Sequence, residues 1–425
     1  MEQTKPIRVL HIITRMIVGG AQENTLLSVE GLDRMPQYDV TLLSGIDTGR
    51  EGELLTRAEQ TTKLIVLPQL ARAINPFDEL IVLWKLHKII RQGRYHIIHT
   101  HSAKAGVLGR IVAWLARTPI IIHTMHGVGF HDYQPWLVNR AWKLIERICA
   151  PLTDYFISVS DSTTEKAVAA KIDRREKFRT IYSGMELDWY LNAKVDGNAV
   201  RREFGIPEDA LVVGKVARLT FQKNHDKLID AAPEIVRRHP NVRFFLIGDG
   251  PLHEHVQERI RQAGIFENFV FAGLIDRSRI PEMISAMDML VHTARYEGLA
   301  RVLPQALAMS KPCVSLEADG AQEVIIPGET GYLVQPDDIA GLADAVSKLL
   351  SDKDLRQRMG ENGRNLVDPM FRAETMVEQI AEVYQMLLQK YPKRIDLFNK
   401  KTKKLGLTAN HQNIGRLSST DDLQP

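Results

Sequence analysis

Glu297 and Gln305 stand in the segment ARYEGLARVLPQALA (294–308), which suits the binding of a phosphorylated ligand. Glu297 ends an apolar, strand-like run, while Pro304 and Gln305 fall in the first turn of the helix that follows. Backbone N–H groups at the start of a helix are not used within it, so they can bind phosphate oxygens while the two polar side chains bind hydroxyl groups. The residues that would present these N–H groups are Gly298, Leu299, Ala300, Arg301 and Val302.

Two cations follow another strand-like run, in the segment VARLTFQKNHD (216–226). Arg218 stands at the predicted strand end, and Lys223 lies in the loop that follows. Two positive charges at a strand terminus suit a diphosphate, and a guanidinium can bind it through two parallel hydrogen bonds. The alternative is a solvated pair of loop residues. We treat both side chains as candidate diphosphate ligands.

The first half of the chain has a glycine pair and a histidine at comparable positions. Gly19 and Gly20 follow the first strand-like run and open a helix, where backbone N–H groups and the helix dipole can hold an anion. A tight strand-to-helix turn is the alternative, and no G-x-G-x-x-G dinucleotide motif opens such a turn. His126 follows the run IIIHTM (120–125), at the strand end where parallel sheets bind ligands, and its ring can hydrogen-bond a sugar hydroxyl.

Other histidines raise the question of a metal site. His99 and His101 fall on one face of a predicted strand, with Lys104 at the following turn. The sequence offers no third ligand at a suitable spacing, so we predict that no metal is bound. His123 falls inside a strand and is interpreted as a packed side chain. The acidic pair of the segment DKD (352–354) is interpreted as helix capping.

Short apolar runs that alternate with helical segments must position these residues. The runs are rich in Val and Ile throughout, which is typical of parallel strands covered by helices on both faces. A polar, poorly periodic stretch separates two sets of runs. We therefore predict an α/β protein with two Rossmann-like, doubly wound parallel-sheet domains facing a ligand cleft. The predicted strands span residues 7–14, 38–45, 62–68, 96–102, 120–127, 155–160, 210–219, 241–250, 268–274, 288–294 and 311–317.

The same pattern sets the predicted domain limits. Residues 1–185 form the first domain, 186–207 a linker and 208–370 the second domain. Residues 371–391 have apolar side chains at helical spacing and form a closing helix. Residues 392–425 are first basic and then polar, so we predict that they lack fixed structure.

The composition is that of a globular protein. The chain has 425 residues, of which 44% are hydrophobic and 25% are charged, and this length suits two domains. It has two cysteines, no apolar run of the ~20 residues needed to span a bilayer and no recognisable signal peptide, so we expect a cytoplasmic protein. The net charge of +3 gives no reason to expect a nucleic acid as a partner.

Two segments combine apolar and basic side chains. Residues 76–96 contain Leu80, Leu83 and Trp84 among several lysines and arginines, and residues 136–150 have a similar character. Segments of this kind bind membrane interfaces, so a peripheral contact with the inner face of a membrane is one interpretation. The other is that both segments are crossover helices packed on the sheet with basic outer faces.

As a set, these motifs resemble those of the retaining glycosyltransferases of family 4, which have the GT-B fold. The resemblance covers roughly residues 7–390 and depends on the whole set of motifs. In the first domain they are GGAQ (19–22), H-x-H-x-x-K-A-G-x-L-G-R (99–110), HTMHG (123–127) and SVSD (158–161). In the second domain they are GKVARLTFQKNH (214–225), LIGDGP (246–251), FAGL (271–274) and the segment 288–312 around EGLARVLPQ.

The resemblance implies transfer of a sugar from a UDP- or GDP-sugar to an acceptor, with retention of configuration and without a metal or other cofactor. The donor would bind mainly to the second domain and the acceptor to the first. The cation pair and the glycine pair would contact the diphosphate. His126 would lie beside the donor sugar, Glu297 would bind its hydroxyls, and Gln305 would meet the ribose.

The sequence departs from the family pattern at two positions. Gln305 stands where the family usually has a second glutamate, and its amide oxygen can accept a hydrogen bond but carries no charge. Ala300 stands where many relatives have glycine or proline. Two alternatives stay open: a nucleotide-sugar epimerase or hydrolase on the same scaffold, and a non-catalytic nucleotide-sugar-binding relative. The acceptor is also open among a polysaccharide, a lipid-linked sugar, a small molecule and a protein.

Overall fold

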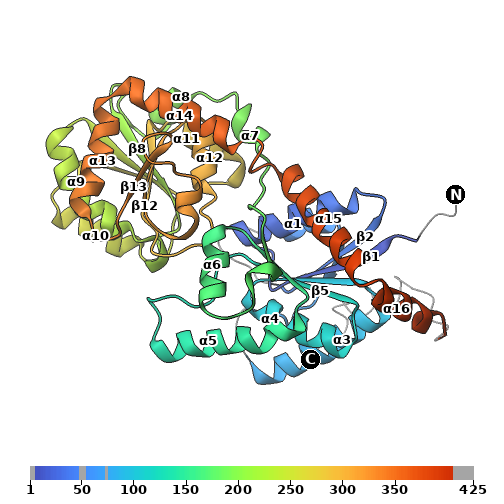
Figure 1. Cartoon of the computed structure of the whole chain (residues 1–425). Helices are drawn as coiled ribbons and strands as arrows, with labels where there is room; N and C mark the ends of the chain where they lie inside the picture. Colours follow the sequence, from blue (N-terminus) through green and yellow to red (C-terminus); the bar gives the residue numbers. More distant parts are fainter. Residues whose placement is uncertain (1–4, 47–53, 72–74, 405–425) are drawn as a thin grey trace, which may run out of the picture. The chain divides into compact units, whose positions relative to one another are not determined.

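The structure is a computed structural model that describes residues 5–46, 54–71 and 75–404. It has two compact units (Figure 1). The described residues of Met1–Met185 and of Ala373–Pro425 form the first unit, and Glu186–Arg372 form the second. Each unit is a parallel sheet covered by helices, so the predicted α/β class with two Rossmann-like, doubly wound domains is confirmed.

The sheet of the first unit has seven strands in the order β3-β2-β1-β4-β5-β6-β7. All pairs are parallel, and β1 contacts both β2 and β4. The order therefore reverses direction between β1 and β4, which is the switch point where doubly wound sheets bind ligands. The strands are β1 (Ile7–Ile13), β2 (Tyr38–Ser44), β3 (Lys63–Val66), β4 (Ile97–His101), β5 (Ile120–Met125), β6 (Tyr155–Ser158) and β7 (Phe178–Thr180).

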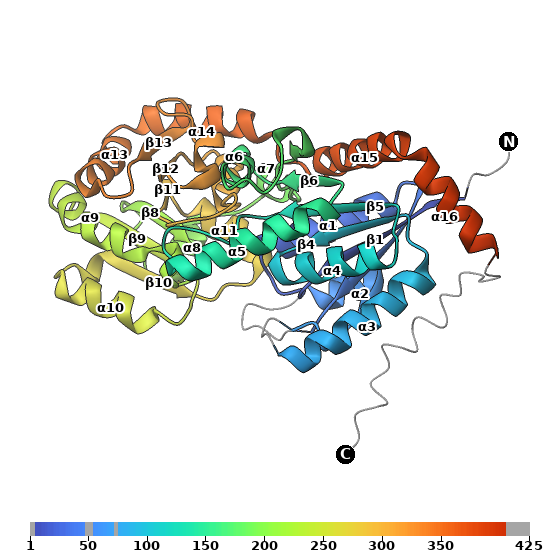
Figure 2. The same ribbon diagram turned by 60° about the horizontal axis from the view of Figure 1, so that its bottom comes forward.

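Helices cover both faces of this sheet because its strands are apolar on both sides. Val9 and Ile13 of β1 pack beneath α1 and α15, while Leu10 and Ile12 face α3 and α4 on the opposite side (Figure 1). In Figures 1 and 2, α3, α4 and α5 lie side by side. The helices of the unit are α1 (Gly20–Asp33), α2 (Leu55–Thr61), α3 (Pro76–Gly93), α4 (Ala103–Leu115), α5 (Trp136–Cys149), α6 (Asp161–Ala169), α15 (Ala373–Lys390) and α16 (Pro392–Lys404).

The second unit repeats this architecture with six strands in the order β10-β9-β8-β11-β12-β13. Its switch point lies between β8 and β11. The strands are β8 (Leu211–Val216), β9 (Val242–Ile247), β10 (Phe269–Gly273), β11 (Met289–His292), β12 (Cys313–Leu316) and β13 (Gly331–Val334). The helices are α7 (Asp188–Leu191), α8 (Gly197–Glu203), α9 (His225–Arg238), α10 (His253–Gln262), α11 (Ile280–Ser285), α12 (Val302–Ala308), α13 (Ile339–Ser351) and α14 (Lys353–Val367).

The segment interpreted as a linker, 186–207, has its own structure within the second unit. It contains α7 and α8, and Arg279 holds α8 through an ion pair of 2.6 Å with Glu203. The segment interpreted as a closing helix forms α15 and packs within the first unit, where Tyr38 donates a hydrogen bond to the Ala381 carbonyl. The chain therefore returns to its first unit after completing the second.

The expectation that residues 392–425 lack fixed structure is wrong for the part that the structure describes. Residues 392–404 form α16, and 405–425 lie outside the described residues. Arg394 pairs with Asp154 at 2.7 Å, and Asn399 lies 3.1 Å from His96. These contacts could not be predicted from the basic composition, because the residues that they join lie far apart in the sequence. None of the helices that the structure describes is long and apolar enough to cross a bilayer.

Candidate active site

Lys223 and Glu297 meet at the switch point of the second unit. Lys223 ends the short 3-10 helix η3 (Phe221–Lys223) after β8, and Glu297 follows β11, the strand next to β8. The Lys223 ammonium contacts the Glu297 carboxylate, and the two side chains keep exposed fractions of 23% and 11%. Two residues that the sequence assigned to separate motifs therefore form one charged, partly shielded pair.

Hydrogen bonds hold the two loops of this pair against each other. The Arg295 backbone N–H donates to the Gln222 carbonyl over 2.9 Å, and the Gln222 side chain donates to the Tyr296 carbonyl over 2.9 Å. The Arg295 guanidinium donates to the Asn224 side chain and lies 4.1 Å from the centre of the Phe221 ring. The loops after β8 and β11 thus form one connected structure.

Glu297 is further positioned by groups behind it. Its backbone N–H donates to the Asp319 carboxylate, and Nε2 of His292 lies 3.8 Å from Oε2 of Glu297. His292 is buried, and burial lowers its pKa well below the ordinary value, with the charges of Lys223 and Lys215 adding to the effect. Because the His292 imidazole is neutral, the cationic partner of the Glu297 carboxylate is Lys223.

Lys215 is a buried cation that the sequence analysis missed. It lies inside β8, and its Nζ donates to Oγ1 of Thr293 over 2.6 Å, while Thr293 donates to the Asn224 carbonyl. Burial lowers the pKa of Lys215 to about 7, with a further contribution from Lys223. Burial also lowers the pKa of Lys223 to about 8, with a contribution from Arg218. The sequence signal that could have revealed this buried cation is a lysine inside the apolar run of β8.

An anionic ligand would stabilise the protonated form of both lysines. Arg218, just beyond β8, is exposed, and its positive charge contributes to the lowered pKa of Lys223. The three cations therefore give the end of β8 a positive field that a diphosphate would neutralise. Two of them were candidates from the sequence, and the structure places both at this strand end.

The loop before α12 presents backbone N–H groups, as the segment 294–308 predicts. Among the described residues, no acceptor hydrogen-bonds the N–H groups of Leu299 or Ala300, and both residues are buried. Gly298 precedes them, and Arg301 caps α12. Gln305 lies in α12 and is half-buried, and within the described part of the chain its side chain has no hydrogen-bond partner. The Gln305 amide is therefore available to a ligand.

In the first unit, Gly19 and Gly20 stand at the N-terminus of α1, directly beyond β1. Gly19 is the N-cap, and its carbonyl accepts a hydrogen bond from the Glu23 N–H. A Cβ atom at Gly19 would lie 2.7 Å from Oε1 of Gln22, so a side chain there requires Gln22 to move. The absence of a side chain at Gly19 leaves room for the Gln22 side chain at the N-terminus of this 14-residue helix.

His126 follows β5 and is connected to buried histidines of the same sheet. Its Nε2 lies 3.1 Å from Nδ1 of His101, whose Nε2 lies 2.9 Å from Nδ1 of His11. Nε2 of His11 lies 3.0 Å from the Tyr384 hydroxyl, which in turn lies 2.7 Å from Nδ1 of His99. This chain of hydrogen bonds ends at Thr124, whose hydroxyl lies 2.6 Å from Nε2 of His99.

This chain of hydrogen bonds links the tautomers of its members. Burial lowers the pKa of His11 to about 3 and that of His99 and His101 well below the ordinary value, so these rings are neutral. A neutral imidazole donates through one nitrogen and accepts through the other, and the Tyr384 hydroxyl has a single proton. If Tyr384 donates one of its two hydrogen bonds and accepts the other, all bonds of the chain run in one direction, and the tautomer of His126 is coupled to the position of the Tyr384 proton.

The same geometry bears on the prediction that no metal is bound. His11 supplies the third ligand that the sequence did not reveal, since the ligating atoms of His11, His99 and His101 lie within 4.8 Å of one another. The ring nitrogens of these three residues are already hydrogen-bonded to each other, to Tyr384, to Thr124 and to His126. A bound ion would have to replace some of these bonds.

The predicted site residues are thus divided between the units. Arg218, Lys223 and Glu297 form one cluster in the second unit, where Gln305 and the N–H groups of 298–301 lie on the loop and helix that follow Glu297. His126 and the glycine pair lie beyond strands of the first sheet, and His123 is buried as expected, with its Nδ1 2.9 Å from the Thr100 hydroxyl.

Two Rossmann-like units, with candidate anion- and hydroxyl-binding groups beyond the strands of each, are typical of the GT-B class of glycosyltransferases. Comparisons with known proteins agree with this class. The family model "Glycosyltransferase Family 4" matches residues 18–189, and the model "Glycosyl transferases group 1" matches residues 196–366. The chain therefore belongs to the family 4 glycosyltransferases.

Individual relatives and solved structures are similar over most of the chain. An Escherichia coli UDP-Gal:alpha-D-GlcNAc-diphosphoundecaprenol alpha-1,3-galactosyltransferase is 26% identical, over 89% of this chain and 96% of that protein. The capsular polysaccharide biosynthesis glycosyltransferase CapM of Staphylococcus aureus is 25% identical, over 76% and 85% of the two chains. The structure of Anabaena HepE in complex with UDP-glucose has a TM-score of 0.75 at 23% identity and covers 89% and 100%, which shows a shared fold.

Proposed function

We propose that this glycosyltransferase moves a sugar from a nucleotide-diphosphate sugar to an acceptor, with retention of anomeric configuration and without a metal. The observation that carries the proposal is the pairing of Lys223 with Glu297 beside the N–H groups of residues 298–301. Cations and N–H groups suit a diphosphate, while a carboxylate suits the hydroxyls of a sugar. UDP and GDP are the candidate donor nucleotides, and the relatives that use or bind UDP-sugars favour UDP.

In the proposed reaction the bond between the anomeric carbon and the diphosphate oxygen breaks. A new bond forms between that carbon and the acceptor oxygen on the same face of the sugar. The acceptor hydroxyl gives its proton to the leaving diphosphate, whose negative charge Arg218, Lys223 and the N–H groups stabilise. Glu297 holds the donor sugar by its hydroxyls. His126 is assigned a hydrogen bond to the same sugar, and Gln305 a hydrogen bond to the ribose.

We propose an acceptor that carries a sugar on a lipid or a polysaccharide. Two relatives support this, because their names place them in capsular polysaccharide synthesis and in transfer to a diphosphoundecaprenol-linked sugar. A peripheral membrane contact fits such an acceptor. It is supported by Trp84 of α3 and Trp136 of α5, whose side chains are 62% and 65% exposed and lie close to Lys88 and Arg140.

A panel of UDP, GDP, ADP and their sugars tests the proposal. A nucleotide that binds the native protein raises its melting temperature, so one of these compounds should do so at millimolar concentration. The corresponding sugar nucleotide is then incubated with and without lipid-linked acceptors. Transfer to an acceptor, with hydrolysis slow in its absence, supports the transferase. Isomerised or hydrolysed donor alone supports the epimerase or hydrolase, and binding without turnover supports the non-catalytic relative that Gln305 suggests.

A further inference from the structure

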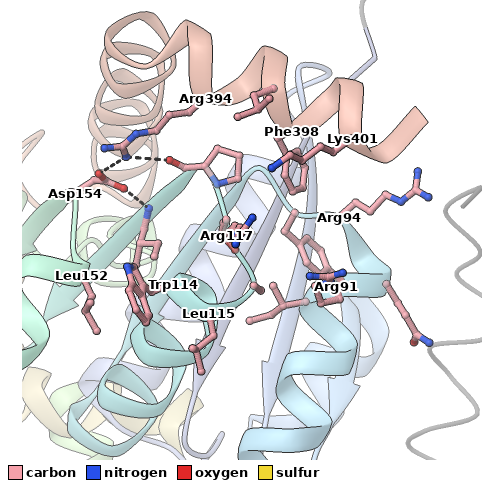
Figure 3. Close-up of a pocket in the computed structure, with 18 of the residues that line it drawn as sticks. Arg91, Arg94, Trp114, Leu115, Arg117, Leu152, Asp154, Arg394, Phe398 and Lys401 are labelled. Atoms are coloured by element: carbon pink, nitrogen blue, oxygen red, sulfur yellow. Dashed lines mark hydrogen bonds and ion pairs between the residues drawn. The ribbon is translucent and has the colours of Figure 1, made fainter. Parts of the chain in front are cut away.

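A cavity of about 950 Å³ lies in the first unit (Figure 3), and none of the residues that line it is a predicted site residue. Its walls come from the ends of α3 and α4, from the turn after α5 and from α16. Tyr95, Pro119 and Asp154 border it just before β4, β5 and β6 begin. His126 and Gly19 stand beyond the opposite, carboxyl ends of strands of the same sheet. A ligand in this cavity therefore need not compete with a ligand at His126.

The cavity carries an excess of positive charge. Asp154 is the single acid among the described residues that line it, and Arg394 already pairs with this carboxylate at 2.7 Å and donates to the Pro119 carbonyl (Figure 3). Four further cations line the walls, and no carboxylate in the described part of the chain pairs with any of them. They are Arg91, Arg94, Arg117 and Lys401.

Arg94 has buried polar atoms that no described protein group satisfies. Its Nε and Nη2 atoms are shielded from solvent, yet no acceptor among residues 5–46, 54–71 and 75–404 bonds them. Burial lowers the pKa of Arg94, and the neighbouring charge of Arg8 lowers it further. Arg91 lies in the last turn of α3, where a cation also offsets the helix dipole. The dipole does not account for Lys401, which comes from α16.

Apolar side chains share the cavity with these cations. Trp114 and Leu115 from α4 and Leu397 from α16 are each more than half exposed, and Leu152 and Phe398 complete the apolar lining. A small hydrophilic anion would make no favourable contact with these apolar side chains. An amphiphile with an anionic head and an apolar body fits both parts of the lining.

The neighbouring helices continue this mixed surface. The helices α3, α4 and α5 lie side by side, and α5 leads through a turn to Leu152 at the cavity. Along α5, Trp136, Leu144 and Ile148 are 65%, 57% and 60% exposed and alternate with Arg140 and Lys143. Large exposed apolar side chains of this kind gather where a protein meets another apolar phase.

We propose that this cavity binds the phosphate headgroup of an acidic phospholipid while the protein rests on a bilayer. Arg94 and Arg117 take the phosphate oxygens, and Trp114, Leu115 and Leu397 contact the glycerol and upper acyl region. The inference deepens the proposed membrane contact and rests on it. It adds a defined headgroup site at the end of the sheet opposite to the carboxyl ends of its strands.

Vesicle flotation with the full-length protein tests this site. The vesicles contain phosphatidylcholine alone or phosphatidylcholine mixed with phosphatidylglycerol. The test variant is Arg94→Gln with Arg117→Gln, and the matched control is Lys353→Gln with Arg358→Gln in α14, which removes the same charge from exposed positions of the second unit. We expect binding to the acidic vesicles to fall by about fivefold for each cavity cation removed, and to stay within about twofold for the control.

Three results would overturn the inference: no flotation of the natural protein on acidic vesicles, equal losses in both variants, or a rise in melting temperature with glycerol 3-phosphate without vesicle binding. The last would assign the cavity to a soluble phosphate. The melting-temperature response to UDP is measured on the same samples. If UDP still binds when the vesicle result fails, the headgroup site is wrong and the nucleotide-sugar site stands.

Discussion

The Lys223 ammonium contacts the Glu297 carboxylate, although the two residues belong to loops that follow different strands. The contact joins a group suited to a diphosphate with a group suited to sugar hydroxyls. In the proposed reaction these two groups lie on either side of the bond that breaks. We expect each group to exchange its partner for one half of the donor when a donor binds, so the pair would hold the two side chains ready for it.

Removing either Lys223 or Arg218 should weaken binding of the diphosphate. Lys223→Ala or Arg218→Ala is expected to cost about 2–4 kcal/mol of transition-state stabilisation, because a charge-assisted contact to the leaving group is lost. Affinity for the nucleoside diphosphate should fall in both variants, while affinity for the nucleoside should barely change. Isothermal titration with UDP and uridine measures both. Undiminished UDP binding in the two variants would remove these residues from the site.

The affinity for a diphosphate should fall as the pH rises above about 7, first through loss of the proton of Lys215 and, above about 8, through loss of the proton of Lys223. Burial lowers the pKa of free Lys223 to about 8, and a bound diphosphate stabilises the protonated form, so binding takes up a proton above that pH. Below it, Lys223 is already charged and contributes no pH dependence. Titrations in buffers of different ionisation enthalpy measure the uptake. Lys223→Arg stays charged and should lose this component, whereas an identical pH profile in both proteins would contradict the assignment.

Gln305 is expected to work as a substitute for the glutamate usual in the family. Gln305→Glu should change the rate by less than about tenfold, because the added charge is favourable at the start of α12 but repels the diphosphate. Gln305→Leu should reduce it more, because a ribose hydroxyl is left without an acceptor. Steady-state kinetics against donor concentration measure both changes. A leucine variant with the natural KM for the donor would show that Gln305 does not meet the ribose.

Tyr384 should control the tautomer of His126 without contacting it. Tyr384→Phe removes the hydroxyl that links His11 with His99, so the chain no longer imposes one direction on its hydrogen bonds. We expect the ¹⁵N spectrum of His126 to change from one tautomer to a mixture, and stability to fall by about 1–3 kcal/mol. Tyr38→Phe is the matched control, because Tyr38 packs edge-on against Tyr384 but bonds the Ala381 carbonyl. The same change in both variants would indicate packing alone.

The sequence predicted the sheets and the loop positions better than it predicted the groups behind them. Strand ends could be read from apolar runs, which is why Lys223 and Glu297 were both found. Their contact depends on β8 and β11 being neighbours, which local patterns do not encode. His11 and Tyr384 were missed for a related reason, because they reach His99 and His101 through strand register and through a helix at the far end of the chain. Helix α16 was missed because the basic composition of residues 392–404 does not show which residues of the first unit they contact.

The most direct test of the account is the rate of sugar transfer by Glu297→Gln. The change keeps the size of the side chain and removes the charge that contacts Lys223 and that we propose to bind the sugar hydroxyls. The account predicts a loss of about tenfold to a thousandfold in kcat/KM, at ~1.4 kcal/mol per decade, with UDP affinity retained. Full transfer activity in Glu297→Gln would contradict the account.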